Sequence, residues 1–290
     1  MSRYRFIEAE KAGQSVVRLC RLLRVAPSGY YAWKKRAPSA RAAANAALTE
    51  QIRAVHERSR GTYGSPRVHA ELREVGPVGR KRVARLMREA GLVGCRPRGF
   101  RRTTIADPTA QADDLVKRHF RPAGLDQLWV SDITYVGTDE GWLYLATILD
   151  ACSRRVIGWS LADHLRTELA LDALAMALDR RRPAPGLIHH SDRGTQYLAH
   201  AYTARLADRH VRQSVGCPGT CWDNAVAESF FATLKTELLH RQRWATSQQA
   251  RTAIFEYIEG FYNRQRRHST LGYLSPADFE DRYHRQATAA

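Results

Sequence analysis

The sequence predicts an α/β fold in which small all-helical modules precede a mixed five-stranded sheet flanked by helices. Two patterns predict it. Residues 1–102 hold short amphipathic stripes separated by tight turns, which indicate helices. Residues 122–245 instead alternate short apolar strands with longer helices, an order typical of sheets whose faces are covered by helices.

A charge asymmetry separates the same two parts of the chain. Residues 1–121 contain 27 basic and 10 acidic side chains, whereas residues 122–290 contain 19 of each, so the whole formal charge of +17 lies in the first part. Arginine, which suits bidentate contact with phosphate, supplies most of that charge. The asymmetry favours an electrostatic anchor for a polyanion such as nucleic acid over the alternative of a merely solvated basic surface.

Hydropathy and cysteine usage narrow the class of protein. The chain has no charge-free run of about 18 apolar residues, and its polar start does not resemble a secretory signal, so we expect no membrane partner. The five cysteines are odd in number and mostly scattered, which favours a reducing cytoplasm. Cys217 and Cys221 lie close together but lack a matching pair at zinc-finger spacing, and we interpret them as ordinary thiols.

Residues 1–45 are predicted to be a helical DNA-binding segment. One helical face collects the apolar residues Val16, Leu19, Cys20 and Leu23. We expect this helix to end at Pro27–Gly29 and a second short helix, aromatic and basic, to follow. The Ala-rich stretch Ala37–Ala47 then leads into the next helix.

Residues 46–102 are predicted to be a helix-turn-helix module, because three short helices, Leu48–Arg58, Pro66–Glu74 and Arg80–Ala90, are separated by tight turns. In the third helix the apolar positions expected to pack inward are Val83, Leu86 and Met87. The side chains left to face DNA are Arg80, Lys81, Arg82, Arg85 and Arg88. We interpret this helix as the recognition helix, with a basic solvated helix as the alternative.

An arginine-rich arm follows the module and is expected to contact phosphates. Its basic residues are Arg96, Arg98, Arg101 and Arg102. The polar residues 103–121 are interpreted as a linker to the sheet domain.

The second half predicts strands and helices in a definite order. The strands are expected at Leu128–Val136, Trp142–Leu149, Arg155–Leu161, Leu187–His190 and Val211–Val215. The helices are expected at Thr167–Arg180, Ala199–His210 and Asn224–His240. This order matches the ribonuclease-H-like fold, in which the first and fourth strands are neighbours, so we assign residues 122–245 to such a core and residues 246–290 to a helical extension of it.

Three acidic residues then become candidates for one site. Asp132 lies inside the first strand and Asp192 at the end of the fourth, and two carboxylates brought that close repel unless cations neutralise them. Glu228 lies four residues after Asn224 and seven before Lys235, so these three share one helix face. Taken singly, each acid also fits a capping, turn-binding or solvated role, and only the constellation favours a metal site.

Motif strings support that constellation. The strings WVSDITY, HHSDRGTQY and DNAVAESFFATLK, with 35 residues between Asp192 and Glu228, resemble the three acidic motifs of the transposase and retroviral-integrase superfamily. More narrowly, RGTYGSPRVHAELR and YNRQRRHSTLGYLSPADFE resemble the second-frame (OrfB) protein of the bacterial insertion-sequence family numbered three. The chain lacks the upstream helix-turn-helix and leucine zipper that are often fused to this region in the family, and also the zinc-binding pairs of retroviral integrases.

The resemblance implies a DDE-type transposase that cleaves DNA and transfers strands at the ends of a mobile insertion element. It implies that Asp132, Asp192 and Glu228 are the catalytic triad and that Lys235 contacts DNA near the cleaved phosphate. Three carboxylates without a Cys or His ligand favour Mg²⁺ or Mn²⁺, with two ions per site. As hypotheses, Asp132 bridges both ions, Asp192 binds one and Glu228 binds the other.

The same resemblance implies partners and a location. The expected ligands are double-stranded DNA of the terminal inverted repeats and of the target, bound by at least a dimer. Whether the upstream-frame (OrfA) protein is also a partner stays open. A bacterial cytoplasmic, nucleoid-associated location follows from these expectations.

Several supporting roles are left as alternatives. His190 is the candidate for supporting the carboxylates from behind, because His189 and His190 must point to opposite faces of a strand. Asn224 or Asp223 is expected to cap the Glu228 helix. The segment Tyr262–His268 either tracks the DNA backbone or forms a helical lid. Two rival functions, a DNA-binding regulator without catalysis and a ribonuclease-H-type nuclease without strand transfer, also fit the sequence.

Overall fold

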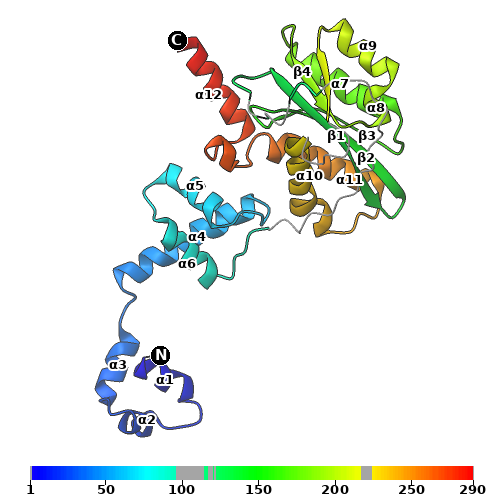
Figure 1. Ribbon diagram of the computed structural model, residues 1–290. Helices are drawn as coiled ribbons and strands as arrows, with labels where there is room; N and C mark the ends of the chain where they lie inside the picture. Colours follow the sequence, from blue (N-terminus) through cyan, green and yellow to red (C-terminus); the bar gives the residue numbers. More distant parts are fainter. Residues whose placement is uncertain (1, 96–113, 117–119, 121, 217–223, 290) are drawn as a thin grey trace.

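In the computed structural model, two helical modules precede a sheet domain and its helical extension (Figure 1). The described residues are 2–95, 114–116, 120, 122–216 and 224–289. The modules contain α1 (Arg3–Glu10), α2 (Val16–Leu22), α3 (Pro27–Lys35), α4 (Ala40–Arg58), α5 (Ser65–Val75) and α6 (Arg80–Glu89). Among the described residues, no helix combines the length and apolarity needed to cross a bilayer.

The first module is built on a small core. Its buried side chains are Ile7, Leu19, Cys20 and Tyr30. The expected helix end at Pro27–Gly29 is wrong: α2 already ends at Leu22, and Pro27 opens α3, since a proline without an N–H costs nothing in the first turn of a helix. Sequence patterns missed α1, because only Ile7 of that helix is buried and one residue makes no stripe.

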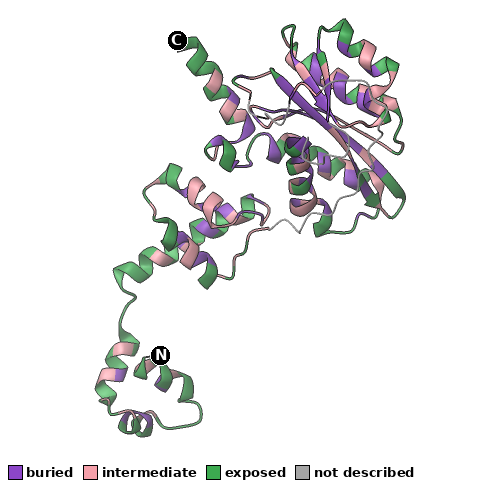
Figure 2. Cartoon of the chain, viewed as in Figure 1, coloured by how far each residue is buried: buried purple, intermediate pink, exposed green. Residues whose placement is uncertain are grey.

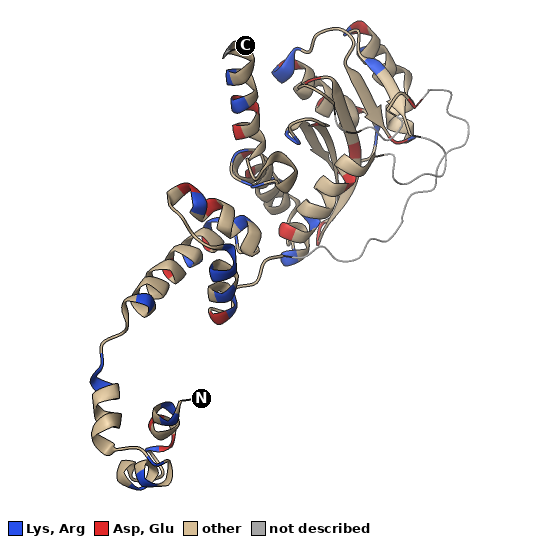
Figure 3. Cartoon of the chain, turned by 60° about the vertical axis from the view of Figure 1, so that its left-hand side comes forward, with Lys and Arg blue, Asp and Glu red and all other residues tan. Residues whose placement is uncertain are grey.

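The second module consists of α4, α5 and α6, which pack on one another. The Ala-rich stretch belongs to α4, whose first turn is capped by Ser39: its Oγ accepts a hydrogen bond from the backbone N of Ala42 at 3.2 Å. Val83, Leu86 and Met87 of α6 are buried as expected, and the opposite side of α6 carries a dense run of Lys and Arg (Figure 3).

The sheet has five strands in the order β3-β2-β1-β4-β5 (Figure 1). The strands are β1 (Leu128–Thr138), β2 (Gly141–Asp150), β3 (Val156–Ala162), β4 (Ile188–Ser191) and β5 (Arg212–Val215). β1 pairs antiparallel with β2 and parallel with β4. The predicted ribonuclease-H-like arrangement, with the first and fourth strands side by side, is therefore confirmed.

Helices cover both faces of this sheet (Figure 1), and the strands between them are largely buried (Figure 2). One face packs on α7 (Thr167–Arg181), α8 (Thr195–Leu198) and α9 (His200–Asp208). The other face packs on α10 (Ala225–Glu237) and on α11 (Ser247–Phe255). α7 lies so close to β3 that a Cβ on Gly158 would stand 2.2 Å from the carbonyl oxygen of Ala173.

The C-terminal extension joins the sheet domain to the second module. The short η2 (Leu239–Arg241) precedes it, and it comprises α11, the π-helix η3 (Glu256–Tyr262), η4 (Ser269–Leu271) and α12 (Pro276–Ala289). The guanidinium of Arg267 pairs with Glu71 and Glu74 of α5, and its backbone N donates to the hydroxyl of Tyr63 at 2.7 Å. Arg267 is therefore a link between modules, which for this residue favours the lid alternative over DNA contact.

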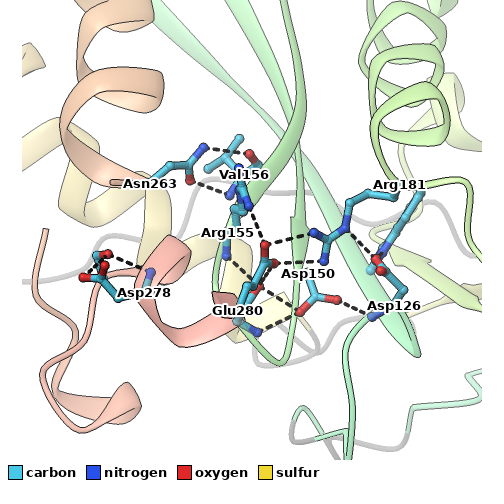
Figure 4. Close-up of polar contacts among 11 residues, drawn as sticks. Asp126, Asp150, Arg155, Val156, Arg181, Asn263, Asp278 and Glu280 are labelled. Atoms are coloured by element: carbon cyan, nitrogen blue, oxygen red, sulfur yellow. Dashed lines mark hydrogen bonds and ion pairs between the residues drawn. The ribbon is translucent and has the colours of Figure 1, made fainter. Parts of the chain in front are cut away.

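Helix α12 is fastened to the sheet by a buried ionic cluster (Figure 4). The carboxylate of Glu280, whose side chain is 3% exposed, accepts hydrogen bonds from both terminal nitrogens of Arg181 at 2.9 and 3.0 Å and from the hydroxyl of Ser153 at 2.7 Å. The Nε of Arg181 donates to Asp126 at 2.9 Å. Burial alone would raise the pKa of Glu280, but Arg181 and Ser153 hold it below its usual range.

We predict that Glu280→Gln lowers the free energy of unfolding by about 3 kcal/mol, because it leaves the buried Arg181 charge without its main counter-ion. The matched control is Asp139→Asn, which removes an exposed pair with Arg243 and should cost less than about 1 kcal/mol. Urea denaturation of both variants measures the difference. Equal losses would show that α12 is not held by this cluster.

Candidate active site

Strand register brings the two aspartates together. In the parallel pair, Val130 of β1 lies opposite His190 of β4, and Asp132 and Asp192 each follow two residues later. Because side chains alternate along extended chain, Asp132 returns to the face that Val130 occupies. Val130 packs in the same cluster as the apolar residues of α10, whereas the neighbouring Trp129 packs against α7. Asp132 therefore lies on the α10 side of the sheet.

Both aspartates are half-buried, and one carboxylate oxygen of each accepts a backbone hydrogen bond. Oδ1 of Asp132 accepts a hydrogen bond from the backbone N of Ile133 at 2.7 Å, and Oδ1 of Asp192 accepts one from Gly194 at 3.0 Å. The second oxygen of each makes no hydrogen bond with a described residue. Each carboxylate is thus fixed in orientation by one oxygen, which leaves the other available for a ligand.

Helix α10 is tied to β1 beside Asp132. Asn224 stands at the N-cap position, but its side chain does not cap the helix: its Nδ2 donates to the backbone oxygen of Ser131 at 2.7 Å. Capping by Asn224 is therefore wrong, and the alternative cap, Asp223, lies outside the described residues. This longer-range bond instead fixes where α10 starts, and so where Glu228, one turn further along, stands relative to the strand.

The rest of α10 follows the predicted pattern, apart from its end. Val226, Phe230 and Leu234 are buried, while Glu228 and Lys235 are half-buried on the other side. The helix ends at Glu237 rather than His240, because the chain turns there into the short η2. Glu228 makes no hydrogen bond or ion pair with a described residue, so its carboxylate is not held in a structural pair.

Burial and the neighbouring carboxylates affect the protonation of Asp132. Burial, followed by the charges of Asp192 and Glu228, raises the pKa of Asp132 to about 8, and Lys235 opposes this rise. Burial also raises the pKa of Asp192 and of Glu228. In the described part of the chain, no three ligating side chains converge closely enough to hold one ion. Unneutralised carboxylates repel one another, and such a set suits a cation that neutralises them.

The two neighbouring histidines point to opposite faces, as expected from strand alternation. The ring of His190 bonds through Nδ1 to the hydroxyl of Ser214 at 2.9 Å, and its charge lowers the pKa of Asp192 against the effect of burial. His189 bonds through Nε2 to Tyr202 at 2.9 Å, and burial lowers its pKa to about 3, so that it stays neutral. His190 alone stands on the side of the acids.

The predicted DNA-contacting residues fall into three groups. In α6, Arg80, Lys81 and Arg88 are exposed. Two others are held locally: Arg82 donates to Asn45 at 2.9 Å, and Arg85 pairs with Glu89 at 2.8 Å. The arm residues Arg96, Arg98, Arg101 and Arg102, like Cys217 and Cys221, lie outside the described residues.

Sequence patterns did not single out two aromatic residues beside Lys235. The ammonium of Lys235 lies 5.4 Å from the ring centroid of Tyr135, which stacks edge-on with Trp142 at 5.3 Å. Both rings are more than half exposed, at 52% and 57%. Their alternation along β1 and β2 was available in the sequence, but nothing local indicated that α10 would bring a lysine onto them.

Comparisons with known proteins identify matching domain families, similar sequences and a similar solved structure. Integrase core domain models match residues 123–221 and 209–276, and an HTH-like domain model matches residues 43–100. The chain is 44% identical to the insertion element IS600 uncharacterized 31 kDa protein of Shigella sonnei, over 93% of this chain and 100% of that one. It is 42% identical to transposase InsF for insertion sequence IS3A of Escherichia coli K12, over 97% and 99%. Among solved structures, the catalytic core domain of BIV integrase aligns with a TM-score of 0.43 and 17% identity, over 56% of this chain and 99% of that one.

The raised pKa of Asp132 predicts a pH-dependent stability. A carboxyl group whose pKa is higher in the folded than in the unfolded chain favours folding at low pH, and this contribution is lost as the pH rises from about 4 to about 8. In metal-free buffer at pH 8, Asp132→Asn should therefore raise Tm by roughly 2–4 °C for each kcal/mol of stability recovered, and by a smaller amount at pH 5. Calorimetry of this variant and of the exposed control Asp163→Asn checks it; the same change in both variants would contradict the coupling.

Proposed function

Because this chain belongs to the IS3 family of insertion-sequence transposases, we propose that Asp132, Asp192 and Glu228 are the carboxylates with which it cuts and joins DNA. The chain is a transposase with an integrase core, and DNA transposition is its function. The observation that carries the assignment of residues is the β1–β4 register, which leaves Asp132 and Asp192 two residues beyond paired positions. The bond from Asn224 to Ser131 supports the placement of Glu228 on the same side.

The donor set supports divalent cations as cofactors. Each aspartate keeps one oxygen without a hydrogen bond to a described residue, and Glu228 keeps both, so that the available ligands are hard carboxylate oxygens. Mg²⁺ or Mn²⁺, two ions per site, would be held by these side chains: Asp132 would serve both ions, Asp192 one and Glu228 the other. When bound, such a pair activates the attacking oxygen and stabilises the leaving oxygen of an in-line displacement at phosphorus.

The residues of the chain have distinct tasks in this reaction. Asp132 and Asp192, fixed through their Oδ1 atoms, keep the cation ligands in place without reorganisation. Lys235 lies on the face of α10 that carries Glu228 and interacts with the charge of Asp132, so it is assigned to the DNA phosphate next to the scissile bond. The bond that breaks is a P–O bond of the DNA strand, and the bond that forms joins phosphorus to a water or 3′-hydroxyl oxygen.

DNA binding is assigned first to the helix-turn-helix module. The HTH-like match covers α4–α6, and the exposed Arg80, Lys81 and Arg88 give α6 the charge of a recognition helix. The proposed DNA partners are the terminal inverted repeats and the target. Synapsis of two ends requires at least a dimer, and an upstream-frame protein is a further proposed partner.

We predict that Glu228→Gln and Asp132→Asn each lower the rates of cleavage and of joining by a factor on the order of 10³, because several kcal/mol of charge stabilisation are lost. Labelled terminal-repeat duplexes with Mg²⁺ report both products. Glu256→Gln, at an exposed position, is the control. Unchanged rates in the triad variants would refute the assignment. Cut but never joined ends in the parent would favour a nuclease, and a biological effect that persists in Asp132→Asn would favour a regulator.

A second prediction concerns the recognition helix. Replacing Arg80, Lys81 and Arg88 together with Ala should weaken duplex binding and reduce the slope of log affinity against log salt by up to about 3, roughly one for each phosphate that the helix no longer neutralises. The matched control replaces three exposed arginines of the sheet domain, Arg205, Arg209 and Arg212. A slope that falls equally in the control would assign the binding to net charge and not to α6.

A further inference from the structure

A cavity of about 530 Å³ lies beside the candidate active site, where three parts of the chain meet. Arg67 of the second module, Arg154 of the β2–β3 turn and Arg266 of the extension all line it. Helix α10 contributes Ser229 and Thr233 to its wall. We call this cavity the arginine pocket.

The lining of the arginine pocket is strongly basic. Three guanidinium groups line it, and none of the described lining residues is Asp or Glu. The buried carboxylate of Glu237, behind the lining, is bound by Arg266 at 2.7 and 2.8 Å and lies 3.6 Å from Arg67. The single negative charge of Glu237 is thus shared by Arg67 and Arg266 and neutralises the two positive charges only in part. Arg154 brings a third guanidinium to the lining.

Neighbouring groups respond to this excess of positive charge. Burial and then Arg266, Arg67 and Arg154 hold the pKa of His268 well below its usual range, so the imidazole stays neutral. Burial and the charge of Arg266 also lower the pKa of Arg67. Like charges crowded in a half-buried place repel, and an anion among them relieves that repulsion.

The pocket also offers neutral donors. The hydroxyls of Ser229, Thr233 and Thr270 line it, and none of them makes a hydrogen bond with a described residue. Arginines combined with Ser and Thr hydroxyls are the groups that proteins use to contact DNA phosphates. The neighbouring Arg267 shows the contrast, because Glu71, Glu74 and the carbonyl of Tyr273 occupy its guanidinium.

The position of the pocket beside α10 indicates that its phosphate ligand belongs to DNA. Ser229 follows Glu228 directly on α10, so the pocket opens on the flank of the helix that carries the catalytic glutamate. We infer that the arginine pocket binds a backbone phosphate of the DNA strand that crosses α10, and thereby clamps DNA between the helix-turn-helix module and the sheet domain. This inference rests on the proposed function, since it takes the DNA substrate to lie at Glu228.

The test measures binding without catalysis. Arg67→Gln and Arg154→Gln are compared with Arg205→Gln, which removes the same charge from an exposed position on α9. Binding of a terminal-repeat duplex is followed against salt in EDTA. Each pocket variant should reduce the slope of log affinity against log salt by up to about one, and the control should leave it close to that of the parent. Slopes equal to that of the control would overturn the inference.

A second variant guards against loss of folding. Thr270 is exposed at the pocket, so Thr270→Glu adds a carboxylate without disturbing the bonds of Arg266 to Glu237. It should weaken duplex binding, whereas Thr252→Glu on the exposed side of α11 should change affinity only slightly. If both glutamate variants bind DNA like the parent, the inference is wrong even where the arginine variants fail to fold.

Two further measurements separate the possible failures. Inorganic phosphate that raises Tm of the parent but not of Arg67→Gln, with unchanged DNA slopes, would assign the pocket to a small free anion and overturn the inference. Strand joining by the parent with Mg²⁺ tests the proposed function independently. Joining together with unaltered slopes contradicts the pocket alone, and altered slopes without joining contradict the triad alone.

Discussion

The parallel pairing of β1 with β4 is the constraint on which the site depends. It places two acidic residues, Asp132 and Asp192, at equivalent positions beyond the paired Val130 and His190. Keeping both ionised in a half-buried place is costly, as the pKa of about 8 for Asp132 indicates. The apolar core on both faces of the sheet offsets this unfavourable contribution to folding (Figure 2).

Two other buried carboxylates of the described residues are neutralised by arginines. Glu280 is bound by Arg181, and Glu237 by Arg266, with bidentate geometry in both cases. Two groups of described residues on α10 and beside it differ from this pattern. One is the set of carboxylates around Asp132, which has a deficit of positive charge; the other is the arginine pocket, where Arg67 and Arg266 share the carboxylate of Glu237. The carboxylates suit cations and the arginine pocket suits a DNA phosphate, and strand transfer requires both.

Local patterns predicted most element positions, because alternation and apolar stripes are set by neighbours in sequence. The pairing of the first and fourth strands was predicted from the match of that element order to the ribonuclease-H-like fold. Local patterns failed where the partner of a side chain is far away in sequence. Asn224 bonds to Ser131 rather than capping α10, and Arg267 pairs with Glu71 on another module. The three acidic residues could be predicted as a site only when they were considered together, since each alone also fits a capping, turn-binding or solvated role. The predicted domain limits and the arm after residue 95 stay predictions.

Manganese binding tests the shared carboxylate site most directly. Titration of Mn²⁺ into the chain without DNA, followed by paramagnetic resonance, counts bound ions in the absence of any cleavage reaction. If Asp132 and Asp192 hold cations jointly with Glu228, the parent binds two ions per chain, and Asp132→Asn or Asp192→Asn abolishes tight binding of at least one. Unchanged stoichiometry and affinity in both variants would show that the neighbouring carboxylates are not the metal ligands.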